Sequence, residues 1–85
     1  MPYIDRETRA FLLQGGEPTT AGELNYQLTQ VAIAFWETAP PSYSALNAIV
    51  GAFECAKQEF YRRVVVPYED KKMRENGDVY GDTEC

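Results

Sequence analysis

The chain has 85 residues, the size of one small domain, and a formal net charge of −5. An acidic chain argues against general nucleic-acid binding, because that requires basic side chains to displace counterions. No apolar run approaches the roughly 20 residues that a membrane span needs, so we expect no membrane association. We therefore predict a single domain over residues 1–85, of a size that a partner subunit often stabilises.

The first two predicted elements are helices with clear start and stop signals. Asp5 can cap a short helix that ends at the glycine pair 15–16. A second helix begins at "TAGE", where Thr20 and Glu23 have the spacing of a capping box. It runs to about Glu37, because the prolines of "APP" cannot continue the backbone hydrogen bonds.

The third predicted helix is the longest. Ser42 is its expected cap, and Asn76-Gly77 its expected stop, followed by a short acidic tail over 76–85. Its apolar residues follow the helical period: Leu46, Ile49, Val50, Phe53, Ala56, Phe60 and Val64. Pro67 predicts a kink or break near 63–67. The fold class is thus all-α, with three helices, the last one long and kinked at Pro67.

The second helix has apolar residues on two faces. The expected core stripe is Leu24, Leu28, Val31 and Phe35. A second apolar set, Tyr26, Ile33 and Trp36, lies on roughly the opposite side, and exposed patches of this kind usually mark an interface. We predict that these three residues form a homo-oligomer contact. The alternative is that the first helix covers them through Phe11, Leu12 and Leu13.

Cations and aromatic residues gather in the stretch "EFYRRVVVPYEDKK" at 59–72. Residues 57–74 hold six cations against three carboxylates, although the chain as a whole is acidic. Lysine and arginine complement phosphate, and tyrosines stack on planar bases. The candidate ligand-binding residues are therefore Lys57, Tyr61, Arg62, Arg63, Tyr68 and Lys72.

These residues also have structural explanations. Lys57 falls inside the apolar stripe and could bury its methylenes while its ammonium reaches water. Glu59 precedes Arg63 by four residues, so an exposed ion pair explains one arginine but not Arg62.

Catalytic chemistry has little support. The chain has no histidine, the commonest general base and metal ligand, and no phosphate-binding glycine motif. We predict neither an enzyme nor a cofactor nor a metal site. The two cysteines, Cys55 and Cys85, follow no secretory signal, which favours a reduced, cytoplasmic setting. Cys55 is expected to be a small buried hydrophobe, and Cys85 a mobile thiol.

Several motifs resemble a family of short uncharacterised proteins of tailed phages and prophages. These are "MPYI" at the start, "GELNY" at 22–26, and "EFYRRVVVPYEDKK" followed by "ENGDVY" at 75–80. "TAPPS" and the tail after Tyr80 do not share the resemblance. The family implies a setting rather than an activity: the host cytoplasm during phage infection.

Together these features predict an oligomeric binding protein that sequesters a small phosphorylated ligand, such as a cyclic-nucleotide or ADP-ribose immune signal. The expected partners are the protein itself and that ligand. One alternative is an interaction module that inhibits a host protein through its aromatic and charged surface. Another is an accessory structural protein of the phage.

Overall fold

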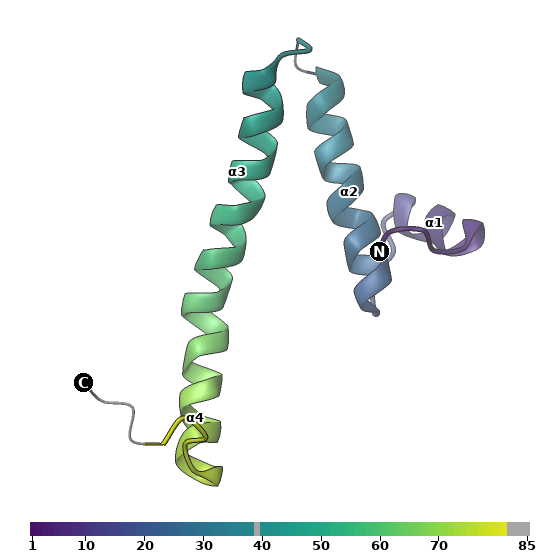
Figure 1. Ribbon diagram of the computed structural model, residues 1–85. Helices are drawn as coiled ribbons and strands as arrows, with labels where there is room; N and C mark the ends of the chain where they lie inside the picture. Colours follow the sequence, from purple (N-terminus) through teal and green to yellow (C-terminus); the bar gives the residue numbers. More distant parts are fainter. Residues whose placement is uncertain (39, 82–85) are drawn as a thin grey trace. The chain divides into compact units, whose positions relative to one another are not determined.

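The computed structural model describes residues 1–38 and 40–81, which are mainly helical and include no strand (Figure 1). Its elements are α1 (Arg6–Leu13), α2 (Ala21–Thr38), α3 (Tyr43–Phe60), the π-helical turn η1 (Tyr61–Val65) and α4 (Val66–Asn76). Because α3, η1 and α4 follow one another directly, they form one helical run over 43–76. The all-α prediction, with three helices of which the last is longest, is confirmed. The chain divides into two compact units, Met1–Ile49 and Val50–Cys85, each described by itself below.

The helix starts are capped by side chains, largely as the sequence predicts. The Thr8 N–H donates to Asp5 Oδ1 at 2.8 Å, and the Ala45 N–H donates to Ser42 Oγ at 3.1 Å. Each bond satisfies one of the backbone donors that a helix N-terminus leaves free. Both predicted caps, at the starts of α1 and α3, are confirmed.

The capping box of α2 involves one residue more than predicted. The Glu23 N–H donates to Thr20 Oγ1 at 3.1 Å, which is the expected half of the box. The returning bond differs, because Glu23 Oε1 accepts from the Thr19 N–H at 2.9 Å and from the Thr19 hydroxyl at 3.2 Å. The carboxylate thus holds the residue before the cap and ties the preceding loop to the first turn of α2.

The Asp5 cap predicts a pH-dependent contribution to stability. The Thr8 backbone N–H lowers the pKa of Asp5 below its ordinary value, because this bond favours the charged carboxylate. A lowered pKa in the folded state stabilises the fold at pH values above about 4, and this stabilisation is lost as the pH falls through the folded pKa. We expect Asp5→Ala to lower the melting temperature at pH 7 and to have a smaller effect near pH 3.

Thermal denaturation followed by circular dichroism at the two pH values measures this effect. Asp5→Asn is the matched control, because it keeps a cap acceptor without the charge. An equal loss for Asp5→Ala at both pH values would contradict the role of the charge.

Pro67 imposes a π-helical turn rather than a break. Proline has no N–H to donate to the carbonyl of Arg63, four residues earlier. In η1 the Val66 N–H donates to the Tyr61 carbonyl, five residues earlier. The wider turn moves the bonding pattern by one residue, so the chain stays helical past the missing donor. Of the two predicted forms, a break does not occur, and the kink at Pro67 stays a prediction. The run ends at Gly77, as predicted, with φ at +92°.

The first unit is held together by α1 lying against the N-terminal half of α2 (Figure 1). Leu12 of α1 and Tyr26 of α2 are both buried, at 4% and 8% exposed. The Arg9 guanidinium lies 5.9 Å from the centre of the Tyr26 ring, a cation–π distance. Gln27 Nε2 donates to the Gly16 carbonyl at 3.2 Å. This small contact positions the first helix.

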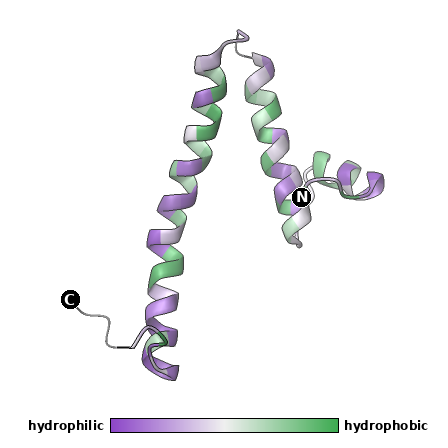
Figure 2. Cartoon of the chain, viewed as in Figure 1, coloured by the Kyte–Doolittle hydropathy of each residue, from purple (hydrophilic) through white to green (hydrophobic). Residues whose placement is uncertain are grey.

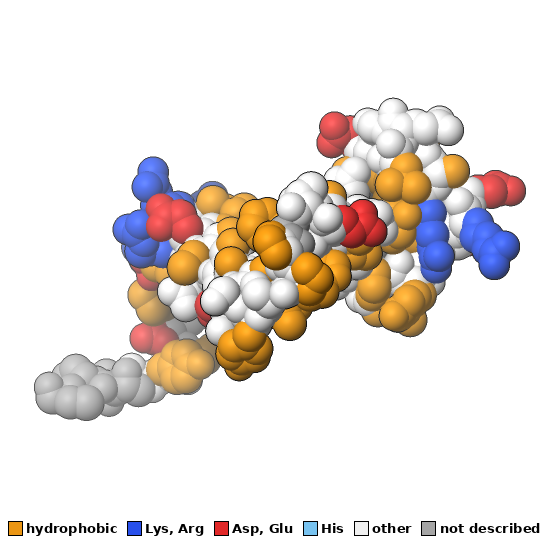
Figure 3. Space-filling view, turned by 90° about the horizontal axis from the view of Figure 1, so that it is seen from above, with side chains coloured by type: hydrophobic (Ala, Val, Ile, Leu, Met, Phe, Trp, Pro, Cys, Tyr) orange, Lys and Arg blue, Asp and Glu red, His pale blue; other side chains and the backbone are white. Residues whose placement is uncertain are grey.

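Most of the expected core is exposed. Figure 2 shows apolar residues along α2 and α3, and Figure 3 shows hydrophobic side chains over much of the visible surface. The stripe expected to form the core of α2 is exposed at all four positions: Leu24, Leu28, Val31 and Phe35. That prediction is wrong, because α1 packs on the Tyr26 side of α2. Cys55 is also exposed rather than buried. Cys85 lies outside the described residues.

Candidate functional site

The six predicted ligand residues all lie on the helical run of the C-terminal unit. Lys57 is in α3, Tyr61, Arg62 and Arg63 are in η1, and Tyr68 and Lys72 are in α4. All six side chains are exposed. The structure brings some of them together in two groups, one on each side of Pro67.

The first group surrounds a shallow hollow of about 420 Å³ on α3 and η1. Its lining residues are Glu54, Lys57, Gln58, Tyr61, Arg62 and Val66. Three of the predicted residues, Lys57, Tyr61 and Arg62, therefore lie around one depression. Its lining combines two cations with a tyrosine, the combination expected for a phosphate joined to a planar group.

Lys57 reaches solvent rather than lying along an apolar surface. Its side chain is 70% exposed, and its Nζ lies 3.2 Å from Glu54 Oε2. Gln58 donates to the same oxygen at 3.0 Å. The Gln58 hydrogen bond, followed by Lys57, lowers the pKa of Glu54, because both favour the carboxylate over the acid. Lys57 is thus partly neutralised in the free protein.

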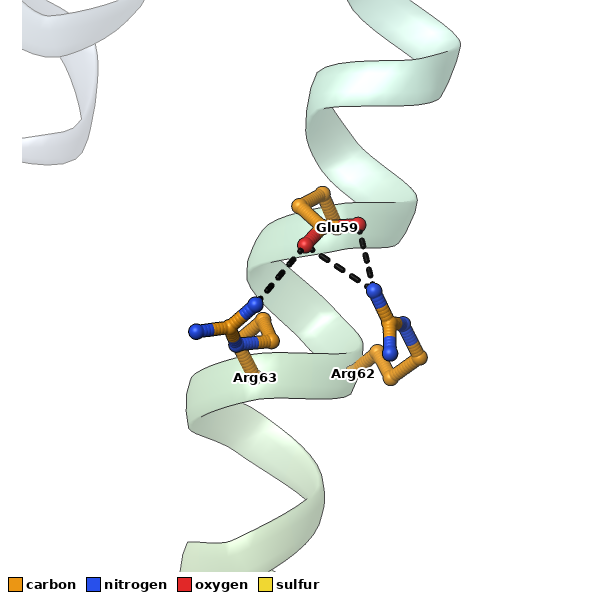
Figure 4. Close-up of polar contacts among 3 residues, drawn as sticks. All are labelled: Glu59, Arg62 and Arg63. Carbon is orange, nitrogen blue, oxygen red and sulfur yellow. Dashed lines mark hydrogen bonds and ion pairs between the residues drawn. The ribbon is translucent and has the colours of Figure 1, made fainter.

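Arg62 and Arg63 share a single carboxylate (Figure 4). Arg62 Nη2 donates to the two Glu59 oxygens at 2.8 and 2.9 Å, and Arg63 Nη1 donates to Glu59 Oε2 at 3.4 Å. The predicted ion pair with Arg63 is confirmed, and Glu59 also holds Arg62. Two guanidinium groups around one carboxylate leave an excess positive charge, so this cluster can still attract a second anion.

Tyr68 and Lys72 form the second group. Lys72 Nζ lies 5.7 Å from the centre of the Tyr68 ring and 3.4 Å from Glu75 Oε1. Lys72 also lines a second shallow hollow of about 380 Å³, between α4 and the segment 76–80. Tyr68 lines neither of the two hollows.

The sequence prediction missed the carboxylates that neutralise these cations. Glu54 and Glu75 lie just outside the window 57–74 that looked strongly basic. Counted over 54–75, six cations face five carboxylates. Lys57 pairs with Glu54, and Lys72 pairs with Glu75, in each case three residues away. Oppositely charged residues three apart on a helix are neighbours, as are residues four apart, so the sequence contains the signal for both pairs.

The predicted oligomer residues are in different surroundings. Tyr26 is covered within the chain by α1, the alternative that the sequence left open. Ile33 is exposed, and Trp36 is half-buried, further along α2. The contact with another subunit remains a prediction. Of the three predicted residues, Ile33 and Trp36 are still available for it, and Tyr26 is not.

Two properties of the described residues, 1–38 and 40–81, bear on other functions. None of the helices is both long and apolar enough to cross a membrane. Over 1–38 and 40–81, no three His, Cys, Asp or Glu side chains gather as potential metal ligands.

Comparison with known proteins identifies the family. A family model described as a domain of unknown function, DUF6899, matches residues 1–79, and the chain belongs to this family. No curated protein and no solved structure shows significant similarity to the chain. The family match covers the first compact unit and most of the second, and it includes the whole helical run 43–76.

Proposed function

We propose that the protein is an oligomeric binding protein that sequesters a small phosphorylated ligand. The observation that carries the proposal is the Arg62–Glu59–Arg63 cluster beside the hollow at Tyr61. A phosphate presents oxygens like those of Glu59, so it can accept hydrogen bonds from the same guanidinium groups. A base or ribose attached to the phosphate would then lie against Tyr61.

The donors present support a phosphorylated ligand. Arginine forks recognise phosphate in a bidentate manner, and Lys57, which lines the same hollow, adds a point charge. Tyrosine stacking is tolerant of base identity. Cyclic nucleotides and ADP-ribose derivatives combine these features and are the first ligands to test. A bend of the helix at Pro67 would bring Tyr68 and Lys72 towards the same ligand, and belongs to the proposal.

The oligomeric part rests on the exposed apolar residues. An isolated chain with so few buried side chains gains little hydrophobic stabilisation, which a second subunit would supply. Ile33 and Trp36 are the contact residues that we propose from the sequence. The similarity of the C-terminal motifs to phage proteins suggests the host cytoplasm as the setting and an immune signal as the ligand.

A second candidate function is inhibition of a host protein by direct contact. The observation that favours it is the exposure of Tyr61, Tyr68 and Phe60 on the same helical run as the arginines. Aromatic residues and arginine are the side chains that most often dominate the energy of protein interfaces.

Thermal shift with a panel of nucleotides separates the two functions. We expect a cyclic dinucleotide, a cyclic trinucleotide or a cyclic ADP-ribose isomer to raise the melting temperature as its concentration increases, because it binds only the folded protein. The shift should shrink at high salt, since exposed charges are screened beyond about 8–10 Å near physiological ionic strength.

The matched variants act on Tyr61. Tyr61→Ala should weaken binding about 5- to 150-fold, the range for loss of one base stack, while Tyr61→Phe keeps most of the affinity. No shift with any member of the panel, for a wild-type protein that captures a host polypeptide from lysate, would replace the ligand proposal with the second candidate.

A further inference from the structure

The second half of the long helical run has an apolar surface beyond the reach of the other described helices, because a short connection joins α2 to the start of α3. Phe60, Val64 and Tyr68 are 61%, 51% and 57% exposed. They recur every four residues, which keeps them on one side of the helix across the wide turn η1. Among the described residues of the C-terminal unit, none is buried.

The helix lengths and the short connection before α3 show why neither α1 nor α2 can pack along this apolar surface. α2 has 18 residues and spans about 27 Å, and the short connection 39–42 joins it to the start of α3. In any hairpin with the long helix, α2 could reach no further than about the end of α3, which also has 18 residues. α1 has only 8 residues and is already packed on α2.

The stretch beyond α3 comprises the 5 residues of η1 and the 11 of α4, about 24 Å of helix. In proteins, most of the stability of a helix comes from packing of its apolar face rather than from helix propensity. Since no other described helix reaches this side, a partner from outside the chain would supply the packing.

The charge pattern indicates which partner fits. Over 54–75 the cations and carboxylates are interleaved and nearly balanced, and most of them pair along the helix. Two copies of such a surface can approach without net repulsion, whereas an interface for a protein of strong net charge would carry one sign over its whole area. We propose that the face formed by Phe60, Val64 and Tyr68 pairs with a second copy of this chain. This inference rests on the oligomeric part of the proposed function.

The test places a charge in the middle of this face. In analytical ultracentrifugation of the full chain, Val64→Glu should convert the oligomer to a 9.6 kDa monomer or raise its dissociation constant at least about 10-fold. Helix content should be retained in circular dichroism, because glutamate is a better helix former than valine. The control is Val79→Glu, the same change at a residue that is 93% exposed and lies after α4; it should leave the mass unchanged.

Each result supports or overturns the inference. If the wild type is oligomeric and Val64→Glu leaves its mass unchanged, the proposed subunit contact at this face is wrong, but the proposed function still stands. A monomeric wild type at 100 µM overturns both the face and the oligomeric part of the function, while nucleotide binding is decided separately by thermal shift. Equal loss of mass in both variants also overturns the face, because the effect would then come from added charge alone.

Discussion

Alanine in place of Arg62 or Arg63 is expected to weaken binding of the phosphorylated ligand by about 10- to 150-fold, equivalent to about 1.5–3 kcal/mol for one charge-assisted hydrogen bond. Isothermal titration with the nucleotide that gives the largest thermal shift measures the loss. The melting temperature without ligand should barely move, because both side chains are exposed and exposed ion pairs contribute little to stability.

Glu59→Gln tests the same cluster with the opposite expected effect on ligand binding. In the free protein Glu59 occupies the donors that a phosphate would use, so removing its charge should strengthen ligand binding by about 1.5- to 5-fold, the range for exposed ion pairs of about 0.2–1 kcal/mol. A purely structural cluster would behave differently: Glu59→Gln would then leave ligand binding unchanged. Loss of folding in Arg62→Ala or Arg63→Ala would likewise show that the arginines are structural.

The second large effect is expected at α2. Replacing both Ile33 and Trp36 with glutamine should reduce the oligomer to the 9.6 kDa monomer in light scattering at tens of micromolar. Truncating a central tryptophan at an interface commonly costs 2 kcal/mol or more, which is about 30-fold in affinity. Glutamine is a good helix former, so α2 itself should persist.

Tyr43→Gln is the matched control for α2, because Tyr43 is an exposed aromatic residue at the first position of α3. It should leave the mass unchanged. If the double variant of Ile33 and Trp36 keeps the wild-type mass, α2 does not form the predicted subunit contact. If both this variant and Val64→Glu dissociate the protein, two separate surfaces contribute to the oligomer.

The helix ends could be predicted from the sequence, because they depend on neighbouring residues. Asp5 and Ser42 accept hydrogen bonds from the N–H groups three residues later, and the run stops at Gly77, where a positive φ favours glycine. The sequence predicted that Pro67 disturbs the helix but did not predict the π-helical turn. A missing N–H can be accommodated by a break, a bend or a wider turn, and neighbouring bonds decide among them.

The ion pairs of the candidate site also join residues close in the sequence, yet the sequence prediction found only one of those made by Glu59. The pairing of Glu59 with Arg63 follows from a spacing of four, but Glu59 also reaches Arg62 at a spacing of three. A carboxylate lies within reach of both positions on a helix surface, and side-chain rotamers decide how it is shared. The apparent excess of cations depended on where the sequence window ended.

Burial was decided only by the tertiary structure. By periodicity alone, the stripe that begins at Leu24 and the opposite side at Tyr26 are both suitable for packing, and α1 covers Tyr26. Periodicity shows which residues share a face, whereas the choice of the buried face depends on where the loop 14–20 returns the short helix. The amino-acid sequence by itself therefore determined the helices and their ends, since those depend on local hydrogen bonds. The packing of α1 on α2 decided which apolar face is satisfied within the chain.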